Sequence, residues 1–157
     1  MRLDQSVVIA APAPRVLQAF FDPDALALWW QAHRSVTTPR TLGVYAIEWT
    51  PTDFRDPILG SLGGVFHGTV VQFHPTQGFF VADAYWLPPE GDPVGPMALD
   101  VGCAPARAPG GETSTRLRVV QSGYDEGPRW RRYYEVVSSG WERALDSLRQ
   151  YLEQGQT

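Results

Sequence analysis

The chain has 157 residues, of which 43% are apolar, so we expect one domain with a sizeable core over residues 1–157, because chains usually divide only above roughly 250 residues. The net charge of −4 argues against nucleic-acid binding, which normally needs a basic excess on one face. The basic residues are all arginine, which excludes Schiff-base chemistry on lysine and a lysine-dependent phosphate loop.

The N-terminal sequence and the cysteine content indicate a soluble, cytoplasmic protein with no membrane partner. The apolar run at residues 7–11 is far shorter than a membrane-spanning helix, and Asp4 stands where a signal peptide carries positive charge. Cys103 is the only cysteine, so it cannot form an internal disulfide. Its strand-like surroundings are typical of a small buried hydrophobe rather than a reactive thiol.

Two short helices are expected before the tandem tryptophans of the sequence FDPDALALWW. Asp22 followed by Pro23 predicts an N-cap with proline at the first helical position, so the second helix begins there and ends near the tryptophans. Neighbouring side chains on a helix point about 100° apart. We therefore expect Trp30 to pack inward near a pocket, and Trp29 to lie against the sheet edge or the loop at residues 53–64.

Runs of β-like sequence recur along the chain and are separated by glycine and proline clusters. They lie at residues 6–10, 42–49, 65–73, 79–87, 97–103 and 115–121. Consecutive strands with short connections predict an antiparallel meander. Alternation places Tyr45 and Trp49 on one face, as it does Met97 and Leu99, whereas charged residues such as Asp100 take the opposite face. The sheet should therefore have one solvated side.

The strand FFVADAYW can be oriented in two ways, which differ in the set of alternate side chains that faces inward. One phase turns four side chains inward: Phe80, Ala82, Ala84 and Trp86. The two alanines would then leave volume between two large aromatic rings. The other phase would turn Asp83 inward, and burying an unpaired carboxylate costs several kcal/mol. We therefore favour the first phase.

A long amphipathic helix is predicted over residues 128–154. Its apolar positions recur at steps of four and three: Trp130, Tyr134, Val137, Trp141, Leu145, Leu148 and Leu152. At about 1.5 Å per residue the helix would run roughly 40 Å, which is enough to cross the whole sheet.

Three segments resemble the single-domain AHSA1-like branch of the START/Bet v 1-like (SRPBCC) superfamily, namely residues 7–30, 67–80 and 121–153. The motifs that carry the resemblance are an Ala-Pro pair opening the first helix, an acidic residue and proline before a tryptophan pair, a Ser-Gly-aromatic turn, and a Gly-Trp pair on the last helix. Here they are Ala11 with Pro12, residues 22–30, Ser122 to Tyr124, and Gly140 with Trp141.

The resemblance implies an α+β helix-grip fold, in which a curved antiparallel sheet wraps around the long C-terminal helix. In many members of the superfamily the cavity between them holds an apolar small molecule. Fold alone does not settle function, because such cavities occur in binding proteins, in cyclases and in solid structural cores. The loop at residues 53–64 and the proline-rich segment at residues 88–96 are longer than the family pattern, and the first could be a mobile lid or an ordinary surface loop.

An aromatic-walled cavity is the candidate binding site. The expected lining residues are Trp30, Tyr45, Trp49, Phe80, Trp86, Met97, Leu99, Tyr134, Val137 and Trp141. The same side chains could instead fill one another's space and form a solid core.

Polar candidates for this cavity are few. His67 lies on a strand and could face the pocket or water, and His33, just beyond the tryptophans, could lie at the cavity mouth. The three histidines are too scattered for a local metal-ligand spacing, so no metal and no cofactor are expected. No Gly-x-Ser-x-Gly elbow occurs.

We interpret the chain as a non-catalytic bacterial protein that binds a hydrophobic or aromatic small molecule. One alternative is an enzyme of the cyclase or hydrolase kind with His67 or Asp83 as general base. Another is an Hsp90-associated, co-chaperone-like module, which only the family's name suggests. A homodimer is compatible with this fold.

Overall fold

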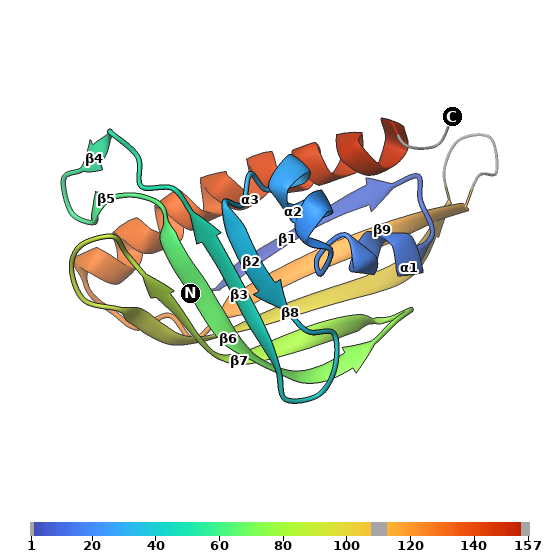
Figure 1. The fold of residues 1–157 in the computed structure, drawn as a ribbon, viewed down its shortest axis with the longest axis horizontal. Coiled ribbons are helices and arrows are strands. Elements are labelled where there is room, and N and C mark those ends of the chain that lie inside the picture. Colours follow the sequence, from blue (N-terminus) through green and yellow to red (C-terminus); the bar gives the residue numbers. More distant parts are fainter. Residues whose placement is uncertain (1, 108–112, 155–157) are drawn as a thin grey trace.

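The computed structural model describes residues 2–107 and 113–154, and it shows a curved antiparallel sheet that partly encloses a long helix (Figure 1). The sheet order is β1-β9-β8-β7-β6-β3-β2. The strands are β1 (Leu3–Ile9), β2 (Arg34–Thr37), β3 (Gly43–Trp49), β6 (Gly64–His74), β7 (Gly78–Leu87), β8 (Val94–Arg107) and β9 (Thr113–Ser122). Each neighbouring pair is antiparallel. The architecture is the α+β helix-grip fold that the sequence predicted.

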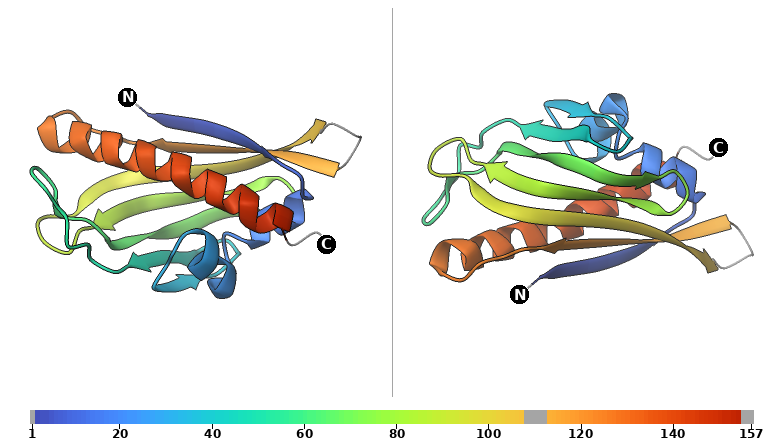
Figure 2. Two further views of the ribbon diagram at one scale, coloured as in Figure 1. Left: turned by 90° about the horizontal axis from the view of Figure 1, so that it is seen from above. Right: turned by 90° about the horizontal axis from the view of Figure 1, so that it is seen from below.

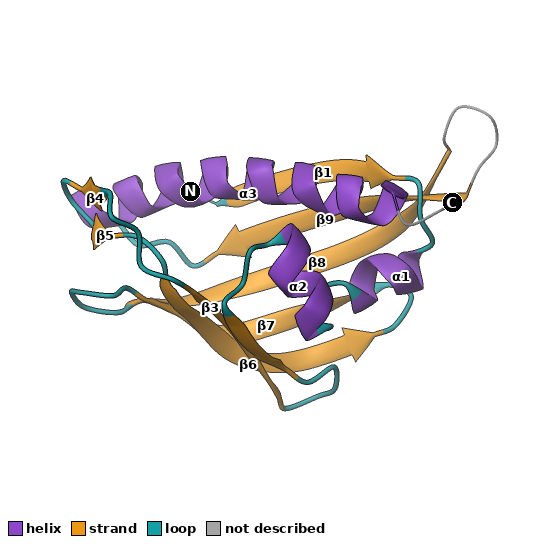
Figure 3. Cartoon of the chain, turned by 45° about the horizontal axis from the view of Figure 1, so that its top comes forward, coloured by secondary structure: helices purple, strands orange, loops and turns teal. Residues whose placement is uncertain are grey.

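Three helices complete the fold, namely α1 (Ala13–Gln18), α2 (Pro23–Trp29) and α3 (Pro128–Gln154). The N-cap prediction for α2 is confirmed, because the Asp22 carboxylate accepts a hydrogen bond from the backbone N–H of Asp24 and Pro23 occupies the first turn. Figures 2 and 3 show α3 running across the concave face of the sheet, with α1 and α2 beside it on that face. None of the described helices combines the length and apolar character needed to cross a membrane.

The core lies between α3, the two short helices and the concave face of the sheet. Helix α3 buries Trp141, Ala144, Leu145, Leu148 and Leu152. The amphipathic pattern therefore correctly predicts the buried face of the C-terminal half of the helix. In its first half the buried residue is Tyr133. On the sheet, alternate residues of β3, β8 and β9 are buried, as the strand patterns predict.

The preferred phase of β7 is wrong in its first half. Phe79 and Val81 face the core, whereas Phe80 is only half-buried and lies outside the core cluster. A β-bulge follows, with Asp83 exposed at a φ of 50°, and it restores Ala84 and Trp86 to the buried face. The bulge lies opposite Gly68, where a side chain would come within 2.6 Å of Val81 and 2.9 Å of the Ala82 carbonyl.

Other departures from the predicted elements lie at chain connections. Strand β2 was not predicted, and the loop at residues 53–64 contains a short hairpin, β4 (Arg55–Asp56) with β5 (Gly60–Ser61). This hairpin lies beside the N-terminal end of α3 (Figure 1). Strand β8 continues to Arg107, beyond the run predicted at residues 97–103, and residues 108–112 lie outside the described residues.

Candidate functional site

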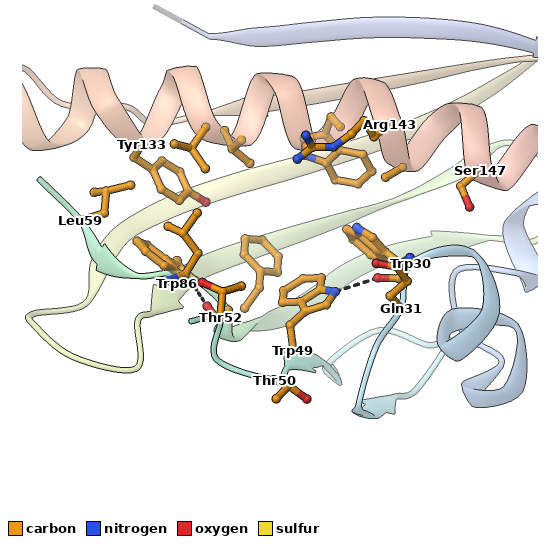
Figure 4. Close-up of a pocket in the computed structure, with 18 of the residues that line it drawn as sticks. Trp30, Gln31, Trp49, Thr50, Thr52, Leu59, Trp86, Tyr133, Arg143 and Ser147 are labelled. Atoms are coloured by element: carbon orange, nitrogen blue, oxygen red, sulfur yellow. Dashed lines mark hydrogen bonds between the residues drawn. The ribbon is translucent and has the colours of Figure 1, made fainter. Parts of the chain in front are cut away.

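A cavity of about 620 Å³ lies between α3 and the concave face of the sheet, and it opens to solvent (Figure 4). Its volume falls within the range of ordinary small-molecule sites, roughly 300–1,000 Å³. Helix α3 forms one wall, and β3, β6, β7 and the end of α2 form the others. The interior is therefore not a solid core, and some of the predicted lining residues form the wall of an open cavity.

Seven aromatic side chains line the cavity. They are Trp29, Trp30, Trp49, Phe66, Trp86, Tyr133 and Trp141. Trp30 is at the centre of this group, because its ring centroid lies 4.8 Å from that of Trp29, 5.3 Å from that of Trp49 and 4.9 Å from that of Trp141. At the other end Trp86 stacks on Tyr133 at 5.4 Å. Such walls offer flat faces to which a planar apolar molecule can bind.

The two tryptophans share the cavity, which corrects their predicted separation. Trp30 lines the cavity as expected, but Trp29 lines it too and is the more deeply buried of the two, at 1% exposure. Their rings are stacked, with only 11° between the planes. Helix α2 ends at Trp29 and Trp30 is its C-cap, with a φ of −109°, so the angle of about 100° between neighbours inside a helix does not decide where the two rings lie.

Hydrogen bonds from the indole nitrogens fix these rings to the protein. The N–H of Trp29 donates to the Ala19 carbonyl at 2.8 Å, and that of Trp86 donates to the Gly63 carbonyl at 2.7 Å. The N–H of Trp49 donates to the Trp30 carbonyl at 2.9 Å. Figure 4 shows the last two bonds as dashed lines. These nitrogens are thus engaged with the protein and are not free to bind a ligand.

Gln121 of β9 is the buried polar residue of the wall, with 1% exposure. Its side-chain oxygen accepts a hydrogen bond from the Trp141 indole N–H at 3.0 Å. Its amide nitrogen donates to the Tyr133 hydroxyl at 3.0 Å and to the Met97 sulfur at 3.3 Å. Burial raises the pKa of the Tyr133 hydroxyl, so the hydroxyl stays neutral. One amide therefore sets the positions of two α3 rings.

The loop at residues 53–64 closes one end of the cavity. Leu59, which is 3% exposed, lines the cavity from this loop. The loop is held to α3 by an ion pair in which the Arg132 guanidinium lies 2.7 Å from the fully buried carboxylate of Asp56. That contact lowers the pKa of the Asp56 carboxyl, and hydrogen bonds from the backbone N–H groups of Leu59 and Ile58 lower it further. Whether the loop moves as a lid stays a prediction.

The structure brings five of the ten expected lining residues to the cavity: Trp30, Trp49, Trp86, Val137 and Trp141. The remaining five do not line it, and there are three reasons. Tyr45, Met97 and Leu99 are buried in the core beside the cavity. Phe80 lies on the other side of the sheet, owing to the bulge in β7.

Tyr134 is the fifth exception. It is half-buried, and its ring packs against Tyr124 with centroids 5.6 Å apart. The preceding residue, Tyr133, takes the cavity position, because it lies four residues before Val137 on the same side of the helix. Steps of three and of four both fit an amphipathic helix, and the sequence pattern selected the wrong one here.

The polar candidates and the proposed general bases lie outside the cavity. His33, His67 and Asp83 are all exposed, and none of them lines it. His67 is on the outer face of β6, with its ring 6.3 Å from that of Tyr85. The hypothesis of an enzyme that uses His67 or Asp83 in the pocket is therefore wrong. Over the part of the chain that the structure describes, no cluster of His, Cys, Asp and Glu has the geometry of a metal site.

Sequence reasoning missed several lining residues, most of them polar or on loops. Besides Trp29 and Tyr133, they are Gln31, Thr50, Thr52, Leu59, Leu62, Gly63, Phe66, Gln121, Val136, Arg143, Ala144 and Ser147. Arg143, Ala144 and Ser147 could have been found, because they continue the helix face of Gly140 at steps of three and four. Gly140 itself lines the cavity, and a methyl group added there would meet nothing within 4 Å.

The cavity and the sheet topology together define a helix-grip protein with an internal pocket. No family model and no curated protein matches the chain. Solved structures do match it over nearly its whole length. Protein MLL2253 from Mesorhizobium loti is 22% identical, with both chains covered completely and a TM-score of 0.68.

Two further solved structures show the same fold. Protein Ms6760 from Mycobacterium smegmatis is 17% identical with a TM-score of 0.70, over 99% of this chain and 92% of that one. A structure described as the Aha1 dimer from Colwellia psychrerythraea is 19% identical with a TM-score of 0.64, over 100% of this chain and 99% of that one. At these identities the likeness establishes the fold but not the function, which has to be argued from the residues of the site.

Proposed function

We propose that this protein binds a hydrophobic or aromatic small molecule in the cavity between α3 and the sheet, and that it belongs to the AHSA1-like branch of the START/Bet v 1-like superfamily. The observation that carries the binding proposal is the cavity of about 620 Å³ with seven aromatic side chains in its wall. Removing apolar ligand surface from water supplies the affinity, at roughly 25 cal/mol per Å² before the cost of association.

The polarity of the wall supports binding rather than catalysis. Its described residues include no histidine, carboxylate or cysteine that could act as general base or nucleophile. The likeness to an Aha1 dimer supports the proposed family and, within it, a homodimer, for which light scattering on the purified protein is the test.

The binding proposal can be tested with dansylamide, a neutral naphthalene probe whose fluorescence rises in an apolar site. We expect saturable binding of one probe per chain, together with energy transfer from the wall tryptophans. Gly140→Leu should then weaken the affinity by about tenfold or more, because its side chain extends into the open space beside Gly140.

Ser139→Leu is the matched control, because it adds the same side chain at the neighbouring, exposed position of α3. It should leave the dissociation constant unchanged. Circular dichroism and urea unfolding should show that both variants are folded. Absence of dansylamide binding by the unmodified protein would overturn the proposal, and so would equal binding by Gly140→Leu and the unmodified protein.

A further inference from the structure

Arg143 is the single charged residue among those that the structure places in the cavity wall. It extends from α3 on the side that faces Trp30 and Gln31, together with Ser147 (Figure 4). No aspartate or glutamate accompanies it there. The chain as a whole carries a net charge of −4, so a cation at this aromatic cavity is opposite in sign to the protein's overall charge.

The Arg143 guanidinium has no ion-pair partner among the described residues, although other arginines do. Arg34, Arg55, Arg118, Arg132 and Arg149 each contact a carboxylate. The acidic residue best placed to reach Arg143 along the helix is Asp146, three positions later. Its carboxylate is already engaged by Arg149 at 2.7 Å and by Gln150 at 2.9 Å. The guanidinium is thus left available to a ligand.

Two neutral hydrogen-bonding groups flank this cation at the cavity mouth. Ser147 follows Arg143 by four residues and so lies one helical turn further on the same face, where it too lines the cavity. Gln31 lies across from them at the end of α2 (Figure 4). Its φ of 59° is a left-handed conformation that is uncommon for a residue with a side chain, and such strain is found preferentially at binding sites.

From this arrangement we infer that the ligand is an amphipathic anion, with an aromatic body against the tryptophans and a carboxylate at Arg143. The planar guanidinium offers paired N–H donors that match the two oxygens of a carboxylate. Gln31 and Ser147 can donate further hydrogen bonds to the same group. The body of the molecule fills the apolar interior, where the indole N–H groups of Trp29, Trp49, Trp86 and Trp141 are already bonded within the protein.

A cationic ligand is the competing chemistry, because cages of tryptophan and tyrosine also bind ammonium groups through the faces of their rings. Such sites commonly add a carboxylate, and the described wall has none. Arg143 would repel a cation at the mouth. The charge of the wall therefore favours the anion.

This inference rests on the proposed binding function, and three dansyl probes separate the two. Dansylglycine carries a carboxylate, dansylamide is neutral and dansylcadaverine carries an ammonium group on the same aromatic body. We expect the unmodified protein to bind dansylglycine about three- to tenfold more tightly than dansylamide, and dansylcadaverine most weakly. Raising NaCl from about 50 mM to about 500 mM should reduce the preference for dansylglycine, since salt screens exposed charges.

Arg143→Gln should abolish the preference, so that the variant binds dansylglycine and dansylamide with equal affinity. Arg131→Gln is the matched control, because Arg131 is an exposed arginine of the same helix outside the cavity wall. If Arg143→Gln retains the preference, or if dansylcadaverine binds most tightly, the inference is overturned while the binding function stands. If no probe binds, both are overturned.

Discussion

Replacing Gln121 by leucine tests whether one buried amide holds the cavity wall in place. Leucine has a similar size, so the change removes the polar contacts with little change in volume. The Trp141 indole N–H then loses its acceptor at 3.0 Å inside a buried site, where Trp141 is 4% exposed. An unsatisfied buried donor costs about 1–3 kcal/mol.

The second contact of Gln121 adds less to the cost. The Tyr133 hydroxyl loses a donor at 3.0 Å, but a hydroxyl can rotate toward another group, so we assign this loss to the lower end of the same range. We therefore expect Gln121→Leu to lower the free energy of unfolding by about 2 kcal/mol. That corresponds to a fall in Tm of ~4–8 °C for a chain of this size.

Urea unfolding followed by tryptophan fluorescence measures the change directly. A double-mutant cycle with Trp141→Phe, which removes the indole N–H, assigns its cause. In the Trp141→Phe background Gln121→Leu should cost about 1 kcal/mol less than in the unmodified protein. An equal cost in both backgrounds, or a neutral effect of Gln121→Leu alone, would refute the reasoning.

Three other predictions follow from single residues. Gly140→Ala should raise the free energy of unfolding by about 0.5–1 kcal/mol, because glycine weakens a helix interior and the added methyl group meets no atom within 4 Å; a loss of stability in urea unfolding would contradict this. Arg132 lowers the pKa of the Asp56 carboxyl, so the stability that this carboxylate supplies is present above its unfolded pKa near 4 and is lost as the pH falls through the lower folded value. The difference in unfolding free energy between the unmodified protein and Asp56→Asn should accordingly be constant near neutral pH and shrink below about pH 4, and a difference that grows toward acid pH would refute this. Burial raises the pKa of the Cys103 thiol to about 11, so at pH 8 Ellman's reagent should label the folded protein on the order of a hundredfold more slowly than the urea-unfolded protein; comparable rates in the two states would show that the thiol is accessible.

The elements that the sequence predicted well are those with a strong, long-range pattern. Helix α3 was expected over residues 128–154 and occupies Pro128–Gln154, because apolar residues recur at helical steps along its length, and a misplaced position such as Tyr134 does not change the type of element. The N-cap of α2 was equally predictable, since Asp22 and Pro23 act through contacts within one turn. Strand β2 has only four residues of mixed polarity and pairs only with β3 at the sheet edge, so nothing local distinguishes it from a loop.

The errors in the predicted site residues arose from local backbone geometry, which a periodic sequence pattern does not encode. The bulge in β7 lies opposite Gly68 on the neighbouring strand, where the two strands come too close for a side chain at residue 68, and this pairing joins residues on two different strands. It moved Phe80 away from the core while keeping Ala84 and Trp86 in place. Similarly, Trp29 stacks on Trp30 at the end of α2, and the ends of elements are the part of a structure that is hardest to predict from sequence.

Whether the aromatic residues form a cavity or a solid core depends on how firmly each ring is held. A flexible ring beside an empty space would turn into it and gain dispersion contacts, because protein interiors favour close packing. The indole N–H groups of Trp49, Trp86 and Trp141 oppose this, since each donates to an acceptor of the protein at 2.7 to 3.0 Å, and a ring that turned away would lose this hydrogen bond. Gly140 adds no side chain that could fill the gap. Contacts within the protein therefore hold the wall in place, and under the proposed binding function a ligand would not have to supply the free energy to open the cavity.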